Sequence, residues 1–337
     1  MSGSLTRREF LARLLALGLG SVAGSALLSA CERGPAPSPI VRAPTSGPAL
    51  PAPTGAPIPT VPRASPPAGA ADLAVVHGAD PAAITRAAVD ALGGMGHFVQ
   101  PGADVIVKPN ICQDYHSYEY AATTNPWVVA ALVTMCREAK AGRVRVMDTP
   151  FGGTPQNAYR VSGIADAVRA AGGEMEVMSQ IKFVETNIPD GRDLSSWNVY
   201  DDILKADLVI NVPIAKHHGL ARLSLGGKNL MGVIAQPSRF HANLGQRVAD
   251  LVSRVRPGLT VVDAVRILTR NGPTGGSLND VEQKDTVIAS PDIVAADAYA
   301  TTLFDVPPDR ISYITAAADM GLGTMDWGTL EVAEIST

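Results

Sequence analysis

One stretch of the chain gathers the residue types that could bind an anion and act on it. Between Asp207 and Asp250 there is no acidic residue, although the whole chain has a net charge of −4. The window holds five basic residues and three histidines, namely Lys216, His217, His218, Arg222, Lys228, Arg239, His241 and Arg247. Charges of one sign create a field that attracts counter-ions. We therefore expect a small anionic ligand in this region.

Three residues of this window could carry the chemistry: His218, His241 and Lys228. An imidazole titrates near neutral pH and can move a proton. Lys228 follows Gly226 and Gly227, which allow the backbone to approach a ligand closely. The sequence Gly-Gly-Lys-Asn lacks the glycine spacing and the Ser or Thr of a P-loop. We predict that a histidine moves the proton and that Lys228 supplies positive charge.

Polar side chains also follow several predicted strands at the point where each strand ends. In an open α/β sheet, ligands bind outside the carboxyl ends of the strands. The predicted ligand-binding residues are Lys108, Asn110, Asp148, Asn211, Lys216 and Asn229. Each of them could instead be a helix cap or a turn residue. The shared position of the first five at strand ends is what favours a site, and Asn229 directly follows Lys228.

A divalent metal is a second interpretation of the same histidines. His218, His241 and Asp263 are the candidate ligands, since imidazole and carboxylate groups bind transition metals. His217 and His218 point to opposite sides of an extended chain, so we do not expect both on one ion. Histidines that donate hydrogen bonds to an anion explain the pattern equally well. The cofactor therefore stays unknown.

The cysteines and the overall charge exclude several classes of protein. The chain has no C-x-x-C-x-x-C run and cannot by itself hold a ferredoxin-type iron–sulfur cluster. We expect Cys112 and Cys136 to be buried free thiols, with a disulfide between them as the alternative. The acidic balance argues against nucleic-acid binding. The absence of Gly-x-Ser-x-Gly counts against the usual α/β-hydrolase chemistry.

The N-terminus predicts export and lipid anchoring. Residues 6–11, TRREFL, show the twin-arginine pattern, and an apolar run with three glycines follows at 14–28. This run is shorter than the roughly 20 residues that span a membrane, so a signal peptide over 1–30 is favoured over a membrane helix. Cys31 ends a lipobox-like LSAC and is the predicted lipid acceptor. The predicted partners are the twin-arginine export machinery and, through the lipid, the extracytoplasmic side of a membrane, with a proline-rich tether over 31–71.

The elements that would position the site lie in residues 72–337. We predict strands over 73–77, 104–108, 143–147, 174–178, 208–212, 259–263 and 286–289. Helices are predicted over 80–92, 125–140, 158–171, 241–255, 291–304 and 309–318. Their alternation predicts an α/β fold, with a mostly parallel sheet flanked by helices in one large domain or two close lobes. Residues 183–201 are predicted to be a hairpin or an insertion. The glycine-rich stretch 271–276 within the loop 269–278 is either a lid or a surface turn.

The chain resembles the domain-of-unknown-function family 362 over about residues 72–306. The motifs that carry the resemblance are VIVKPN (105–110), TTNP (123–126), MDTPFGG (147–153), NVPIAKHH (211–218), GGKNLMG (226–232), TVVDA (260–264), NGPTGG (271–276) and SPDIVAADA (290–298). The resemblance implies no particular reaction. Some family members carry a ferredoxin-like segment and are labelled iron–sulfur proteins, but this chain lacks those cysteines.

The order of three residues is similar to that in nickel-pincer lactate racemases. Those enzymes use a histidine, a lysine after paired glycines and a further histidine. Here His218, Lys228 and His241 come in that order, with Gly226 and Gly227 before the lysine. Two hypotheses follow. The first is an enzyme that acts on a small anion, and the second is a non-catalytic protein that binds a ligand or delivers a cofactor.

Overall fold

The computed structural model describes residues 67 and 69–337, all within one compact unit that spans residues 60–337. The predicted globular part is therefore a single domain rather than two lobes. The predicted signal segment, Cys31 and almost all of the predicted tether lie outside the described residues. Within the described part, no helix is long and apolar enough to cross a membrane.

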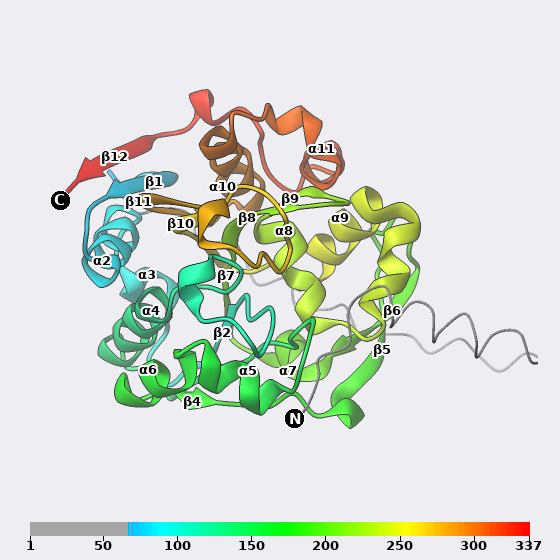
Figure 1. The fold of residues 1–337 in the computed structure, drawn as a ribbon, viewed down its shortest axis with the longest axis horizontal. Coiled ribbons are helices and arrows are strands. Elements are labelled where there is room, and N and C mark those ends of the chain that lie inside the picture. The colour runs from blue at the N-terminus through cyan, green and yellow to red at the C-terminus, as the bar shows by residue number, and fades with distance from the viewer. Residues whose placement is uncertain (1–66, 68) are drawn as a thin grey trace, which may run out of the picture. The chain divides into compact units, whose positions relative to one another are not determined.

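A mixed, mostly parallel sheet runs through the domain (Figure 1). Its main path has the order β12-β1-β11-β10-β7-β2-β3-β4, and β8 and β9 attach beside β10. The strands are β1 (Leu73–His77), β2 (Asp104–Pro109), β3 (Arg143–Val146), β4 (Glu174–Met175), β7 (Leu208–Val212), β8 (Ile214–His218), β9 (Arg222–Ser224), β10 (Leu259–Leu268), β11 (Val281–Ser290) and β12 (Val332–Ser336). β11 runs antiparallel to β1 and β10, whereas the pairs from β10 through β7, β2 and β3 to β4 are parallel. The predicted fold class is confirmed.

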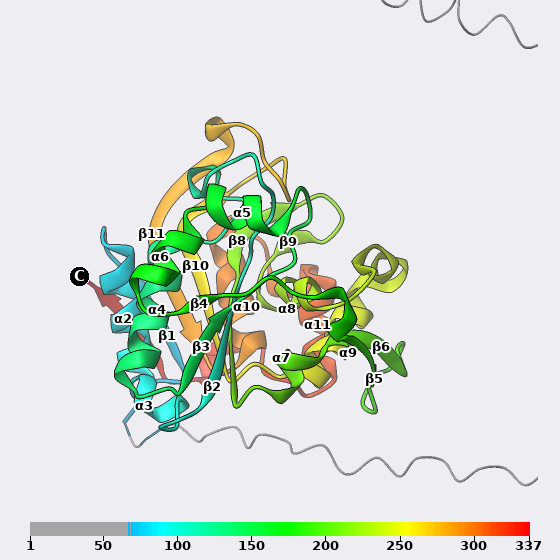
Figure 2. The same ribbon diagram turned by 90° about the horizontal axis from the view of Figure 1, so that it is seen from below.

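Helices cover both faces of the sheet (Figure 2). One face carries α2 (Pro81–Ala91), α3 (Met95–Phe98), α4 (Pro126–Glu138), α5 (Pro155–Val161) and α6 (Ile164–Ala170). The other carries α7 (Asp201–Lys205), α8 (Gly226–Asn229), α9 (Leu244–Val255), α10 (Ile293–Ala300) and α11 (Ser312–Asp319). Alternate residues of a strand point to opposite faces. Accordingly, Val105 and Val107 of β2 join the first core and Ile106 joins the second.

Local sequence sets the ends of the helices near the site. Asn125 caps α4 by accepting a hydrogen bond from Trp127 N, and Pro126 occupies the first turn. The single helix predicted over 158–171 is wrong, because Gly163 adopts a left-handed conformation (φ 77°) that ends α5 and starts α6. The helix predicted from residue 241 also begins later. Residues up to Asn243 form the 3-10 helix η4 (Pro237–Asn243).

The chain returns to the sheet directly after Pro213. The sequence predicted that the strand ends there, since proline has no N–H for the ladder. In the structure Pro213 O still accepts from Asp263 N (2.8 Å), and β8 continues beside β10. β9 then pairs antiparallel with β8 and leads into α8. Residues 183–201 contain the hairpin of β5 (Phe183–Asn187) and β6 (Ser196–Tyr200), one of the two predicted alternatives.

Candidate functional site

A buried ion pair joins the ends of β2 and β3. Lys108 Nζ lies 2.8 Å from Asp148 Oδ1, and both side chains are buried. The ammonium also donates to Asn229 Oδ1 (2.9 Å) and Pro109 O (3.0 Å). Burial lowers the pKa of Lys108 and raises that of Asp148, and the attraction between them opposes both changes. The charge of Lys108 is thus paired inside the fold, and the roles of Lys108 and Asp148 as ligand contacts stay predictions.

The last glycine of GGKNLMG lies against this ion pair. A Cβ atom at Gly232 would come within 2.6 Å of Lys108 Nζ and closer still to Asp148 Oδ1. A side chain at this position would separate the two charges. The glycine is therefore needed for close packing rather than for a turn.

Three asparagines connect β2, β7 and α8. Asn229 Oδ1 accepts from Asn110 Nδ2 (3.1 Å) as well as from Lys108. Asn229 Nδ2 donates to Asn211 Oδ1 (2.9 Å), and Asn211 Nδ2 donates to Gly226 O (3.0 Å). The predicted residues are thus brought together. Their hydrogen bonds hold α8 on the strand ends, and their roles as ligand contacts stay predictions.

Asp297 fixes the two glycines of α8 and was missed by the sequence analysis. Its carboxylate accepts from Gly226 N (2.6 Å) and Gly227 N (2.8 Å). Burial raises the pKa of Asp297 to about 7. A Cβ atom at Gly226 would lie 2.7 Å from Asp297 Oδ1, which explains why glycine is required there. The sequence signal was an aspartate within an otherwise apolar helix, IVAADAYA.

Lys216 is a buried cation that has no carboxylate partner among the described residues. It stands on β8 and is 2% exposed. Its Nζ donates to three neutral oxygens, Asn110 Oδ1 (2.9 Å), Ala122 O (2.7 Å) and Pro273 O (3.0 Å). These hydrogen bonds satisfy its donors but leave its charge unbalanced.

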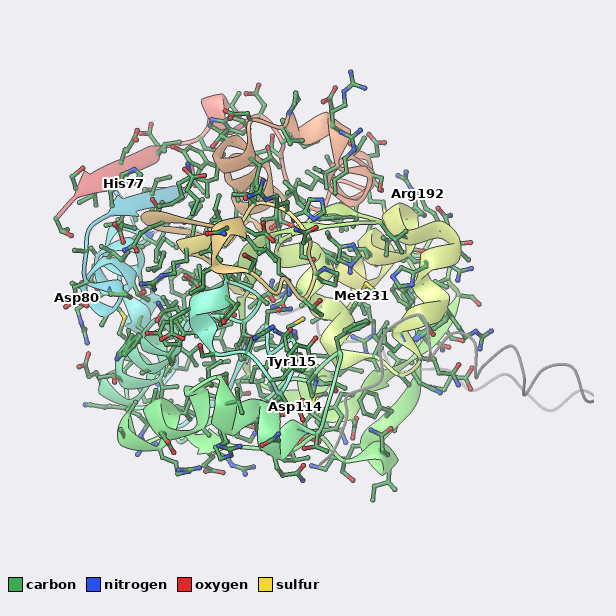
Figure 3. All side chains as sticks on the ribbon, in the orientation of Figure 1. His77, Asp80, Asp114, Tyr115, Arg192 and Met231 are labelled. Carbon is green, nitrogen blue, oxygen red and sulfur yellow. The ribbon has the colours of Figure 1, made fainter. Side chains whose placement is uncertain are left out.

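Lys228 is a second cation without a carboxylate partner among the described residues, and its side chain is partly buried. Among the described contacts its Nζ reaches only Met231 Sδ, at 3.7 Å, which is a weak acceptor. Burial, followed by the nearby charge of Lys216, lowers the pKa of Lys228 to about 8. Figure 3 labels Met231 near the middle of the domain. Lys228 and Lys216 therefore place two unbalanced positive charges close together.

His218 is held as a neutral imidazole beside the two lysines. Its Nδ1 accepts from the backbone N–H groups of Leu220 (3.1 Å) and Ala221 (3.2 Å). The proton of the neutral ring is therefore on Nε2. Burial, then the charges of Lys228 and Lys216, lower the pKa of His218 to about 3. At neutral pH His218 offers an N–H donor rather than a base.

The predicted metal ligands do not assemble. Asp263 accepts from Asn125 N (2.7 Å) and Val265 N (3.0 Å), one bond to each carboxylate oxygen, and burial raises its pKa to about 6. His241 lies in η4 with Nδ1 3.0 Å from Ser238 O, near enough to His218 to influence its charge. In the described part of the chain no three His, Cys, Asp or Glu residues are grouped so that they could hold a metal ion. We therefore correct the prediction that His218, His241 and Asp263 bind one metal ion. Both carboxylate oxygens of Asp263 accept hydrogen bonds from backbone N–H groups instead.

The glycine-rich loop contacts Lys216, His217 and Cys112. Pro273 O accepts from Lys216 Nζ and from Cys112 Sγ (3.4 Å), and Gly272 N donates to His217 Nδ1 (3.1 Å). Cys112 is a buried free thiol, as is Cys136 on α4, so the expectation of free thiols is confirmed.

A surface hollow of about 480 Å³ lies away from the candidate site. It is lined by Pro308, Met325, Asp326, Trp327 and Gly328, and none of these is a candidate residue.

With this geometry in place, comparison with known proteins identifies the family. The chain matches the family described as Domain of unknown function (DUF362) over residues 105–302. It belongs to this family. The match covers β2 through α10. It therefore includes Lys216, Lys228 and His218, which we call the lysine cluster.

Two individual proteins are similar to this DUF362 member. The thylakoid-associated protein sll1697 of Synechocystis is 28% identical over 252 residues, which cover 70% of this chain and 74% of that protein. The lactate racemase apoprotein of Thermoanaerobacterium thermosaccharolyticum is 13% identical, with a TM-score of 0.43. That match covers 74% of this chain and 59% of the racemase chain.

Proposed function

We propose that this protein binds a small organic anion at the carboxyl edge of its sheet and acts on it as an enzyme. The observation that carries the proposal is the buried ammonium of Lys216 together with the partly buried ammonium of Lys228, neither of which has a carboxylate partner among the described residues. A buried charge is costly unless it is paired. A bound anion would offset both charges, and the Nε2–H of His218 would add a neutral hydrogen bond to it.

Within this proposal Lys228 is the residue that moves a proton. A lysine whose pKa lies near neutral pH can exchange a proton at a useful rate, whereas an ordinary lysine stays protonated. The pKa of about 8 for Lys228 supports this role. His218 orients the anion, since its pKa of about 3 leaves it neutral. Entry of the anion requires the loop 271–276 to shift, because Pro273 O occupies one donor of Lys216.

Anion titration of the wild type and two variants tests the proposal. Calorimetry with sulfate, acetate and glycolate is expected to show binding to the wild type. Lys228→Met keeps much of the apolar stem but deletes the charge, and removal of a buried charge partner costs about 2–5 kcal/mol of binding. Lys205→Met is the matched control, because that side chain is 71% exposed and, among the described residues, forms an ion pair only with Asp201. Equal anion affinity in the two methionine variants would remove Lys228 from the site.

The catalytic and the non-catalytic hypotheses differ in the behaviour of Lys228→Arg. Arginine keeps a positive charge but does not release its proton. For an enzyme we expect this variant to bind the anion and to lose turnover. If Lys228→Arg keeps the anion affinity of the wild type and shows no change in turnover, the protein is a binding protein instead.

We further propose that the protein is exported by the twin-arginine route and anchored by lipid at Cys31. The support is the sequence at 6–11 and the lipobox-like LSAC. Changing Arg7 and Arg8 to Lys is expected to leave the protein in the cytoplasm, and Cys31→Ala is expected to release it from membranes. Fractionation followed by immunoblotting measures both. Export of the lysine variant, or membrane retention of the alanine variant, would contradict the respective half of this proposal.

A further inference from the structure

Gln113 lies in the loop after β2, and its side-chain amide is only half engaged. The residue is fully buried. Its Nε2 donates to Thr274 O (3.2 Å), and this bond fixes the orientation of the amide because a carbonyl oxygen only accepts. Oε1 is then an acceptor that no donor among the described residues reaches. Buried polar atoms nearly always have a partner, so this oxygen requires an explanation.

Residues adjacent in the chain to Gln113 and to its partner Thr274 contact or lie near the two lysines. Its partner Thr274 O follows directly on Pro273 O, which accepts from Lys216 Nζ (3.0 Å). Its chain neighbour Cys112 donates to the same Pro273 O and is near enough to Lys228 to interact electrostatically with its ammonium. The Gln113 side chain therefore lies between Cys112, which is near Lys228, and the loop residue that follows the partner of Lys216.

The backbone around Gln113 is held on several sides. Ile111 N donates to Asp148 Oδ2 (2.6 Å), and Cys112 N donates to Thr123 Oγ1 (3.1 Å). On the other side, Asp114, labelled in Figure 3, accepts from Thr154 N (3.1 Å) at the start of α5. A residue fixed in this way cannot turn outward to satisfy its oxygen with solvent.

We propose that Gln113 selects the ligand, its Oε1 accepting a hydrogen bond from a hydroxyl group carried by the anion that Lys216 and Lys228 bind. The inference rests on the proposed function and deepens it. An ammonium group could also donate to this oxygen, but the two lysines would repel it. A neutral hydroxyl group next to the anionic group can donate to Gln113 Oε1 and is not repelled by the two lysines. The ligand class is therefore a small hydroxylated organic anion rather than a plain carboxylate or an amino acid.

The test compares glycolate with acetate, which differ only by the hydroxyl group. Calorimetry on the mature chain is expected to show that the wild type binds glycolate at least about tenfold more tightly, since a buried acceptor left without its donor disfavours the analogue that lacks the hydroxyl. In Gln113→Met, which removes both polar atoms and keeps the length, the preference is expected to disappear while the affinity for acetate is unchanged. Gln113→Glu keeps an acceptor and is expected to keep the preference, with weaker binding of both anions.

The outcomes separate this inference from the proposed function. Equal affinity of the wild type for the two anions would overturn the role of Gln113 and leave the anion site standing. A preference that survives in Gln113→Met would also overturn it, because the hydroxyl group would then be received elsewhere. Failure of the wild type to bind either anion would overturn both the proposed function and this inference. The wild-type comparison needs no variant, so it stands even if Gln113→Met does not fold.

Discussion

Replacement of Lys228 by methionine should stabilise the folded protein while it weakens anion binding. In the folded state the pKa of Lys228 is about 8 against an ordinary 10.5. Each pH unit of this difference corresponds to about 1.4 kcal/mol, so the protonated ammonium costs on the order of 3 kcal/mol of folding free energy. Methionine fills similar space without a charge.

The pH dependence of this effect identifies its cause. Because the folded state holds the proton more weakly than the unfolded state, the full cost is present below pH 8. The cost declines as pH rises from 8 to 10.5, where the folded protein is deprotonated and the unfolded chain is not. The stability difference between Lys228→Met and the wild type should therefore be largest near pH 7 and approach zero above pH 10.5.

Urea unfolding at pH 7, 9 and 10.5 measures this difference. Comparing variant with wild type at each pH cancels the titration of the other lysines and the tyrosines. Lys205→Met, an exposed control, should differ from its wild type by a small and pH-independent amount. A loss of stability in Lys228→Met at pH 7, or a difference that does not change with pH, would refute the reasoning and mark Lys228 as a structural residue paired inside the fold.

Three further variants probe the supports of the site by equilibrium unfolding. Gly232→Ala should lower the free energy of unfolding by roughly 1–3 kcal/mol or more, because its Cβ would enter the buried ion pair. The control Gly96→Ala, where nothing lies within 4 Å of the added atom, should leave the free energy of unfolding nearly unchanged. Equal effects of the two substitutions would refute the close-packing role of Gly232. Asp148→Asn should cost about 3–5 kcal/mol by leaving Lys108 buried and unpaired, and a neutral result would mean that the ion pair is dispensable. The carboxyl of Asp297, with a pKa of about 7 against an ordinary 3.8, should make the wild type lose up to about 4 kcal/mol as pH rises from 4 to 7; Asp297→Asn should lack this component, and an unchanged slope would contradict it.

Much of the fold could be predicted from the sequence because strand and helix patterns are local. The strands over 73–77 and 208–212 have their predicted bounds. β8, β9 and β12 were missed, since they gain their stability from pairing with other strands rather than from their own pattern. The antiparallel position of β11 likewise depends on contacts far away in the sequence.

The sequence predicted which residues come together better than it predicted their partners. Residue types alone placed Lys108, Lys216 and Lys228 together, but they could not tell which lysine has an internal carboxylate. Lys108 has Asp148, and the other two have neutral partners. Gln113 and Asp297 were missed because a glutamine in a loop and an aspartate in a helix usually face solvent. Only their burial distinguishes them.

The most direct test of the central claim is the proton uptake that accompanies anion binding. An anion beside Lys228 must stabilise its ammonium form and raise its pKa. At pH 8, where Lys228 is about half protonated, binding of glycolate should take up about half a proton, and at pH 6 almost none. Calorimetry in buffers of different ionisation enthalpy measures this number. Uptake of about half a proton at pH 8 that disappears in Lys228→Met is the predicted result, and the same uptake in both proteins, or none in the wild type, would contradict the account.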